Sequence, residues 1–251
     1  MKIAIVTGAS SGIGTEFYKL MQDEPLDEVW VVARREKNLI DLCKSHGKIG
    51  HRVIPMDLTD EAALSNFASL LENERPTIKF LFNNAGFGLF GKADEIDYKK
   101  QGKMIDTNVR ALTEFTSIAL KYMDEKSYII NTCSTAAFTP VPNLSAYAAT
   151  KSYVLSFSRA LREELKERKI NVTAICPGPM ATEFLSVAGL GNGESKRFSS
   201  LPYCDPYKTA KNGIKAAKKG KALYTPRFLY NFHRFLAKFA PHSMLMKLTK
   251  V

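Results

Sequence analysis

Short apolar segments alternate with longer segments in which apolar residues recur every three or four positions. The short segments are nearly continuously apolar and rich in Val and Ile, as is typical of parallel strands buried on both faces. Strands are predicted at Lys2–Thr7, Glu28–Ala33, His51–Met56, Ile78–Asn83, Ser127–Cys133, Ile170–Cys176 and Ala222–Tyr224. Helices are predicted near 12–22, 35–46, 60–72, 97–123 (one helix or two), 146–168 and 205–218. This alternation predicts a single doubly wound α/β domain over residues 1–251, with a parallel, seven-stranded sheet and helices on both faces.

Residues 177–204 lie outside this alternation and are interrupted by several glycines and prolines. An irregular excursion of ~28 residues inside a compact domain is typical of a functional lid, so we expect this segment to cover a substrate. Its apolar side chains favour an apolar substrate, and they are Phe184, Leu185, Val187, Leu190, Phe198 and Leu201.

The C-terminal tail, residues 226–251, has the pattern of a basic amphipathic helix. One helical face carries Phe228, Phe232, Phe235, Leu236 and Phe239, and the other carries Arg227, Asn231, Arg234 and Lys238. We expect the aromatic face to pack on the body, on a second subunit or over the substrate entrance. Peripheral contact with a membrane surface is the less favoured alternative.

The composition allows a sizeable core, since 45% of the 251 residues are apolar. No apolar run reaches the ~18 residues of a membrane span, and the first ten residues, MKIAIVTGAS, resemble a strand and not a signal peptide. The four cysteines form no C-x-x-C pair and are expected to be reduced thiols of a cytoplasmic protein. The four histidines lack metal-ligand spacing, so no metal site is predicted.

The net charge of +11 comes from one end of the chain. Eleven of the 36 lysines and arginines follow Asp205, whereas no Asp or Glu does, so the other 25 bases balance the 25 acids. The excess charge is therefore a local property of the tail, and we expect no nucleic-acid partner.

The stretch VTGASSGIG, residues 6–14, allows two interpretations. It fits G-x-S-x-G, the turn that presents a nucleophilic serine, here Ser10, in hydrolases. It also fits a phosphate-binding turn between a first strand and a first helix, with glycines at 8, 12 and 14. A hydrolase needs an acid and then a histidine later in the chain, but the only late histidines, His233 and His242, lie in the basic tail.

The end of the second predicted strand favours the phosphate-binding interpretation. A dinucleotide site places its ribose-selecting residue ~20 residues beyond the glycines. Ala33-Arg34-Arg35 stands there, without an acid. Two guanidinium groups suit a 2′-phosphate, so the sequence favours NADP(H) over NAD(H).

Tyr147 and Lys151 are one turn apart on the same face of a predicted helix. A phenol has an ordinary pKa of about 10, and a lysine cation nearby favours the phenolate. Such a pair can donate a proton to a carbonyl oxygen or remove one from an alcohol. Spacing alone does not identify the pair, because Tyr122/Lys126 and Tyr207/Lys211 share it.

Six elements occur together in the order and spacing of the short-chain dehydrogenase/reductase family, which residues 1–220 resemble. They are Thr7-Gly8-x3-Gly12-x-Gly14, Asn83-Asn84-Ala85-Gly86, Asn108, Ser134, Tyr147-x3-Lys151 and Pro177-Gly178. The resemblance implies a Rossmann-type domain and an NADP(H)-dependent oxidoreductase acting on a ketone or secondary alcohol. A non-catalytic NADP(H)-binding sensor on the same fold is the alternative. The family also forms dimers or tetramers through helices matching 105–123 and 146–168, so a homo-oligomer is expected.

The resemblance also implies roles for individual residues. Tyr147 is the expected general acid/base, Lys151 binds the nicotinamide ribose, Ser134 bonds to the substrate oxygen, and Asn108 holds a water that links Lys151 to solvent. Cys133 departs from the family, which often has a second serine there. Beyond Tyr147 and Lys151, the expected cofactor contacts are Gly8, Ser10, Ser11, Gly12, Ile13, Gly14, Arg34, Arg35, Asp57, Leu58, Asn84, Ala85, Gly86, Pro177, Gly178 and Thr182.

Overall fold

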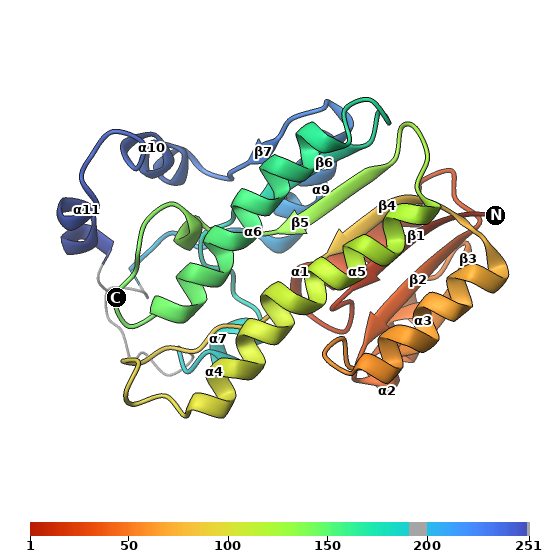
Figure 1. The fold of residues 1–251 in the computed structure, drawn as a ribbon, viewed down its shortest axis with the longest axis horizontal. Coiled ribbons are helices and arrows are strands. Elements are labelled where there is room, and N and C mark those ends of the chain that lie inside the picture. Colours follow the sequence, from red (N-terminus) through yellow and green to blue (C-terminus); the bar gives the residue numbers. More distant parts are fainter. Residues whose placement is uncertain (191–199, 250–251) are drawn as a thin grey trace.

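The computed structural model describes residues 1–190 and 200–249 and contains one seven-stranded parallel sheet (Figure 1). The strand order is β3-β2-β1-β4-β5-β6-β7, so the direction of winding reverses between β1 and β4. The strands are β1 (Lys2–Thr7), β2 (Glu28–Ala33), β3 (Gly50–Pro55), β4 (Thr77–Asn83), β5 (Tyr128–Thr132), β6 (Asn171–Ile175) and β7 (Leu223–Tyr224). In such sheets, ligands bind outside the carboxyl ends of the strands at the reversal.

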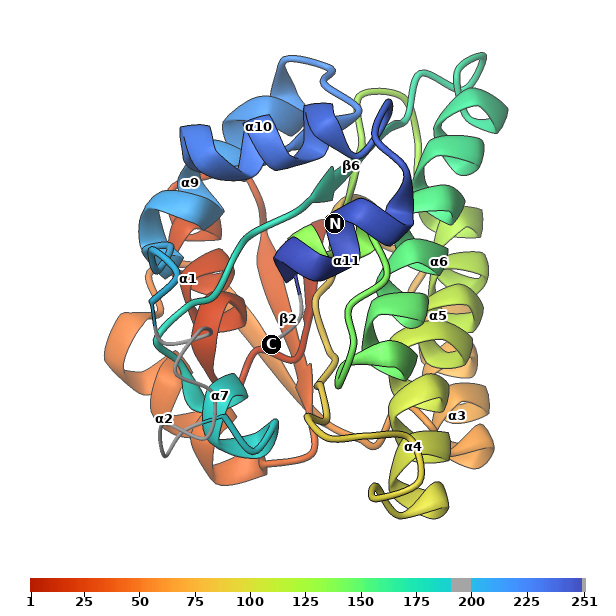
Figure 2. The ribbon, with the colours of Figure 1, turned by 90° about the vertical axis from the view of Figure 1, so that its left-hand side faces the viewer.

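Helices cover both faces of the sheet, as Figure 2 shows. The core on one face includes α1 (Gly12–Met21), α2 (Glu36–His46) and α9 (Pro206–Lys218). The core on the other includes α3 (Glu61–Glu74), α5 (Leu112–Ala119) and α6 (Ser145–Glu164). Alternate residues of β1 are buried in these two cores, Ala4 and Val6 in the first and Ile3 and Ile5 in the second. The predicted doubly wound architecture is confirmed, because every strand pair is parallel.

The segment predicted as one helix or two is a continuous helical run of four pieces. They are α4 (Tyr98–Ile105), a π-helical turn η1 (Asp106–Ala111), α5, and a 3-10 turn η2 (Leu120–Tyr122). The run is uninterrupted, as the one-helix alternative predicts, but its hydrogen-bond pattern changes within it. A π turn inside an α-helix is frequent at functional sites.

The segment predicted as a lid contains a short helix, α7 (Glu183–Val187), which the sequence pattern did not predict. Residues 191–199, including Phe198, lie outside the described residues. The tail forms α10 (Phe228–Leu236) and α11 (His242–Thr249) at the side of the molecule toward which the strands run (Figure 1). No helix in the described part of the chain is long and apolar enough to cross a membrane.

Of the positions expected for the aromatic face of the tail, packing on the body is wrong, while packing on a second subunit stays a prediction. Phe228, Phe232, Phe235 and Phe239 are 85, 48, 58 and 74% exposed. The opposite face of α10 is the one that packs, because Tyr230 is buried and its hydroxyl donates to the Pro202 carbonyl at 2.8 Å.

Candidate active site

A cavity of about 790 Å³ opens at the carboxyl ends of the strands, where the winding reverses. This volume is within the range of small-molecule and cofactor sites. Every residue predicted for the site lines the cavity except Gly14 and Asn108, which lie behind its wall. Among residues 1–190 and 200–249, no cluster of His, Cys, Asp or Glu could hold a metal ion.

The turn after β1 has a backbone that only glycine accommodates. Gly8 has φ of +65°, and a Cβ there would lie 2.8 Å from the Ala85 Cα. A Cβ on Gly14 would lie 2.2 Å from the Gly8 carbonyl oxygen. Both contacts are too short for a real Cβ, so these two glycines allow α1 to start directly against the ends of β1 and β4.

Thr7 joins the same two strand ends. Its hydroxyl donates to the Phe82 carbonyl at 3.0 Å and accepts hydrogen bonds from the backbone N–H groups of Asn84 and Ala85 at 2.9 and 3.1 Å. The Asn84 side chain donates to the Gly8 carbonyl at 3.2 Å. The Asn84-Ala85-Gly86 segment is therefore fastened to the glycine turn.

The N-terminus of α1 fits the phosphates of a dinucleotide. No acidic residue lies in its first turn, and Ser11 makes no side-chain cap, so the first N–H groups face the cavity lined by Ser10, Ser11, Gly12 and Ile13. Free N–H groups and the helix dipole favour an anion there. Arg34 and Arg35 line the same end of the cavity and supply positive charge.

Arg35 also holds two groups across this end of the cavity. Its guanidinium donates to the Ser10 hydroxyl at 3.2 Å and to Glu183 in α7 at 2.7 Å. The partner of Ser10 is thus an arginine and not a histidine, so the hydrolase interpretation lacks its base. Hydrogen bonding from Arg35 is the main cause that holds the pKa of Glu183 below its ordinary value.

The loop after β3 carries Asp57 and Leu58, which both line the cavity. Burial opposes ionisation of Asp57. Hydrogen bonds from Thr59 and the charges of Arg34 and Lys103 outweigh it, so the pKa of this carboxyl is below its ordinary value. Asp57 is therefore ionised at neutral pH.

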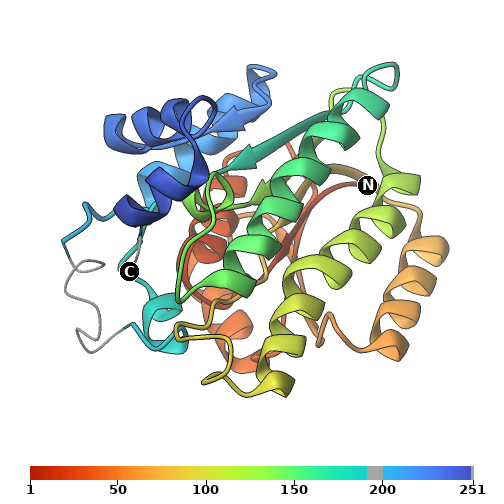
Figure 3. The same ribbon diagram turned by 60° about the vertical axis from the view of Figure 1, so that its left-hand side comes forward.

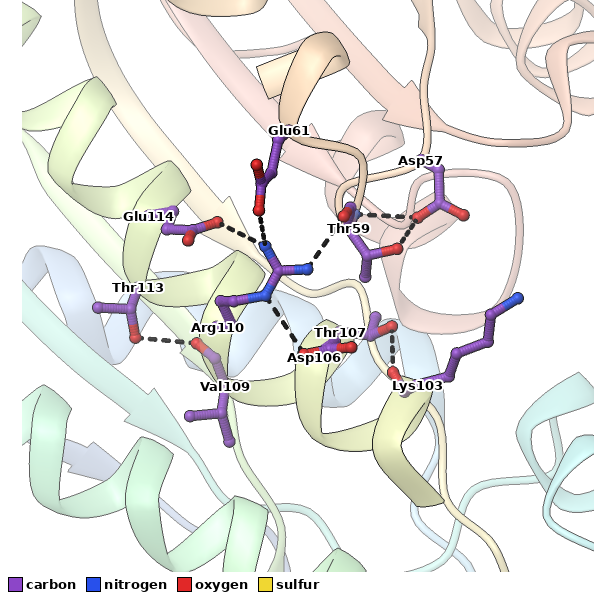
Figure 4. Close-up of polar contacts among 10 residues, drawn as sticks. All are labelled: Asp57, Thr59, Glu61, Lys103, Asp106, Thr107, Val109, Arg110, Thr113 and Glu114. Carbon is purple, nitrogen blue, oxygen red and sulfur yellow. Dashed lines mark hydrogen bonds and ion pairs between the residues drawn. The ribbon is translucent and has the colours of Figure 1, made fainter. Parts of the chain in front are cut away.

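Arg110, in the π turn, fastens this loop to the helical run, as Figure 4 shows. Its guanidinium donates to the Thr59 carbonyl at 3.0 Å and to Asp106 at 3.2 Å. Glu114 and Glu61 lie 3.5 and 3.8 Å from it. No sequence motif marks this cluster, because it joins segments about fifty residues apart.

Tyr147 stands at the start of α6 with only 8% of its surface exposed. Its ring packs against Phe184 of α7 at 5.6 Å between centroids. Burial raises the pKa of its phenol well above 10, although hydrogen bonding to Ser134 acts in the opposite direction. Ser134 is fixed as the cap of the 3-10 turn η3 (Thr135–Ala137), where its Oγ accepts from the Ala136 N–H at 3.1 Å.

Lys151 is also buried, and its Nζ lies 5.8 Å from the centre of the Tyr147 ring. This Nζ donates to the Thr132 carbonyl at 2.9 Å. Burial lowers the pKa of the lysine. The expectation that Lys151 lowers the pKa of Tyr147 is wrong here, because burial of the phenol dominates.

Asn108 lies behind Gly86 and is 1% exposed. Its Oδ1 accepts from the Phe87 N–H at 3.1 Å, and its Nδ2 donates to the Phe87 carbonyl at 2.9 Å and to Thr150 Oγ1 at 3.1 Å. Both amide hydrogens are thus used by protein groups, so the contacts of Asn108 hold the loop after β4 against α6. Asn108 lies within the π turn η1.

Pro177, Gly178 and Thr182 follow β6 along the opposite wall of the cavity. A Cβ on Gly178 would lie 2.3 Å from the Tyr230 ring, so α10 packs directly on this segment. Thr182 lies close to Gly12, since a Cβ built on Gly12 would be 3.5 Å from the Thr182 Cβ.

The lining residues that the sequence did not predict include Glu183, Leu229, Tyr230 and His233. His233 Nε2 lies 3.3 Å from Thr139 Oγ1, and burial lowers the pKa of this imidazole. No motif marks these residues. They reach the cavity through the packing of α7 and α10, which the apolar pattern of the sequence does not define.

The sequence profile described as short chain dehydrogenase matches residues 2–190. A probable NADP-dependent dehydrogenase from Haemophilus influenzae is 32% identical over 197 residues, covering 76% of this chain and 77% of the relative. Serine 3-dehydrogenase from Agrobacterium fabrum is 33% identical over 196 residues, with the same shares covered.

The fold also matches a solved short-chain dehydrogenase from Sphingobium yanoikuyae in complex with NADPH. The TM-score is 0.81 at 24% identity, covering 98% of this chain and 96% of the other. That likeness extends through the tail and supports the fold alone. With a family profile matching residues 2–190 and the site residues gathered around one cavity, the chain belongs to the short-chain dehydrogenase family of oxidoreductases.

Proposed function

We propose that the protein is an NADP(H)-dependent oxidoreductase that moves a hydride between nicotinamide and a ketone or secondary alcohol on an apolar substrate. The observation that carries the proposal is the buried Tyr147 phenol, next to Ser134 and one turn from Lys151, in the same cavity as a phosphate-binding helix N-terminus. A protein that only senses the cofactor does not need a buried acid/base pair. This arrangement therefore favours catalysis over the sensor alternative.

The proposed cofactor contacts follow the cavity wall. The N–H groups at 10–13 hold the pyrophosphate, and Arg34 and Arg35 hold the 2′-phosphate. Asp57 and Leu58 flank the adenine, and Asn84, Ala85 and Gly86 follow the adenosine ribose. Pro177, Gly178 and Thr182 bind the nicotinamide amide, and Lys151 binds its ribose. The name of the Haemophilus relative, a probable NADP-dependent dehydrogenase, supports the choice of NADP(H).

The chemistry needs one proton and one hydride. Bound nicotinamide supplies or accepts the hydride. In the direction of reduction, Tyr147 gives its hydroxyl proton to the carbonyl oxygen, while Ser134 donates a hydrogen bond to the same oxygen and stabilises its developing negative charge. In the direction of oxidation, the phenolate removes that proton from the alcohol. Lys151 positions the site and balances the charge of the phenolate.

The proposed substrate is bulky and apolar. Beyond Tyr147 the cavity is lined mainly by apolar side chains from four segments, including Val141, Leu144, Phe184, Leu190, Leu201 and Leu229. Serine, the substrate named for the Agrobacterium relative, carries two opposite charges that need charged partners. The charged side chains among the described lining residues are Arg34, Arg35, Asp57, Lys103, Lys151 and Glu183. Lys151 Nζ lies 5.8 Å from the centre of the Tyr147 ring.

A substrate panel tests this proposal. Consumption of NADPH and of NADH is measured with bulky apolar ketones, short 3-oxoacyl thioesters, simple aldehydes and, in the reverse direction, L-serine with NADP⁺. We expect the highest kcat/KM with an apolar ketone and NADPH. Serine as the best substrate would overturn the apolar assignment, and a preference for NADH would overturn the cofactor assignment.

A further inference from the structure

The exposed face of α10 and the turn after it carry four phenylalanines. Phe228, Phe232 and Phe235 are spaced by four and three residues, so at ~100° per residue they fall within about 60° of arc, and Phe239 follows in the turn after the helix. Phe228 stacks on Phe232 at 6.4 Å and Phe235 contacts Phe239 at 5.1 Å. Met244 in α11 adds a further exposed apolar side chain, 51% exposed. We call the four phenylalanines the stripe. A contiguous apolar patch of this kind marks an interaction surface.

The stripe is held facing outward by the other side of the helix. Tyr230 is buried against Gly178 and Pro202, and Asn231 donates to the Thr225 carbonyl at 2.8 Å. His233 Nε2 lies 3.3 Å from Thr139. These contacts fix which face of α10 packs on the body, so the fold itself leaves the stripe exposed. Figure 3 shows α10 and α11 (dark blue) at the outer edge of the molecule.

The charges beside the stripe have one sign. Arg227 and Lys238 are exposed beside it and Lys247 follows in α11, whereas Arg234 turns to the body and donates to Thr225 Oγ1 at 3.3 Å. No acid occurs in the sequence after Asp205. A partner for this surface therefore needs both an apolar region into which the rings can insert and negative charge for the bases. A second copy of the chain packed symmetrically on this stripe would bring the two basic flanks toward each other, which disfavours association. An anionic lipid surface offers both properties: acyl chains for the rings and phosphates for the bases.

We propose that the stripe docks the protein on the surface of an anionic bilayer, with α10 in the plane of the interface. The rings of the stripe enter the boundary between headgroups and acyl chains, and the flanking bases contact lipid phosphates. The protein lies on the membrane and does not span it.

Docking also orients the cavity. Leu229, Tyr230 and His233 of α10 line the cavity, while the stripe lies on the opposite side of the same helix. A docked α10 therefore places the cavity wall next to the lipid, so an apolar substrate reaches the site from the bilayer. This last step rests on the proposed function, whereas docking itself does not.

Vesicle flotation with the full-length protein tests docking. The probes are vesicles of phosphatidylcholine alone and of phosphatidylcholine with phosphatidylglycerol, at low and high salt. The wild-type protein should bind the anionic vesicles, and binding should weaken as salt rises. The double variant Phe232→Ser/Phe235→Ser should lose at least tenfold in binding. Lys238→Glu should lose roughly fivefold or more, because each basic residue near the surface contributes about that factor.

Two exposed residues of α4, outside the tail, give matched controls: Tyr98→Ser, which removes an aromatic ring that is 74% exposed, and Lys99→Glu. Both should bind vesicles like wild type. The double variant should also unfold at the wild-type temperature and reduce a water-soluble ketone at the wild-type rate without vesicles. Failed catalysis with intact vesicle binding would overturn only the proposed function.

Three results would overturn docking: no vesicle binding by the wild type, equal binding to neutral and anionic vesicles, or wild-type binding by the double variant. Sedimentation velocity tests the other possible partner of the stripe, a second copy of the chain. A dimer that the double variant abolishes, together with no vesicle binding, would make the stripe a subunit interface.

Discussion

Tyr147 keeps its proton at neutral pH because burial raises the pKa of its phenol. Reduction of a carbonyl needs the protonated phenol, which is the form present below that pKa. Oxidation of an alcohol needs the phenolate, whose fraction grows as the pH rises. We therefore expect kcat/KM for reduction to stay level through neutral pH and fall only in alkaline solution, whereas oxidation rises with pH. Rate profiles in both directions check this. Oxidation that is already maximal below neutral pH would be inconsistent with a raised pKa.

Glu183 forms an ion pair with Arg35, one of the two arginines proposed to bind the 2′-phosphate. Its ion pair with Arg35 is half exposed, so it contributes little to stability, on the order of 0–1 kcal/mol. In Glu183→Gln, Arg35 is free for the 2′-phosphate and one negative charge is removed. We expect KM for NADPH to fall about threefold to tenfold while KM for NADH stays unchanged.

Glu95→Gln is the control for this change, because Glu95 also forms an exposed ion pair, with Lys92, but does not line the cavity. It should leave both KM values at the wild-type level. An unchanged or higher KM for NADPH in Glu183→Gln would mean that the carboxylate does not compete with the cofactor.

Spacing and family resemblance predicted that Ser134, Tyr147 and Lys151 lie at one site, and all three line the same cavity. Glu183 and His233 were not predicted, because they reach the cavity only through the packing of α7 and α10. The direction of the shift in the pKa of Tyr147 was wrong, since a sequence shows a nearby lysine but not the extent of burial.

At the scale of elements, the close contact between β1 and α1 depends on Gly14. In Gly14→Ala the new methyl carbon would lie 2.2 Å from the Gly8 carbonyl oxygen, which is too close. We expect a loss of about 1–3 kcal/mol in the free energy of unfolding, together with weaker NADPH binding, because the turn has to shift.

Gly102→Ala is the matched substitution in α4, where an added Cβ has no neighbour within 4 Å. It should raise the free energy of unfolding by about 0.5–1 kcal/mol through helix propensity. Urea unfolding curves of both variants measure the difference. Equal effects of the two alanines would show that the helix does not start against the Gly8 carbonyl.

The order and kind of the strands and their helices were predicted because period and length identify buried strands and amphipathic helices. The π turn at Asn108 was not predicted, since a single widened turn does not alter the apolar pattern of the run. Helix α7 is too short for its periodicity to be recognised.

At the scale of the whole molecule, a neutral body carries a strongly basic tail. The sequence defined the aromatic and basic faces of this tail but not which face meets the body. That choice depends on the fit of Tyr230 against Gly178, which only the folded structure contains. The homodimer or homotetramer and the cytoplasmic location stay predictions.

We propose above that Tyr147 moves the proton that accompanies hydride transfer, and the remaining roles in the site depend on this step. Its most direct test is Tyr147→Phe, assayed for NADPH consumption with the best ketone of the panel and for NADPH binding by nicotinamide fluorescence. We predict that kcat falls by about 10²–10⁴-fold while the Kd for NADPH stays within about twofold of wild type. Turnover at the wild-type rate in a variant that still binds NADPH would contradict the account.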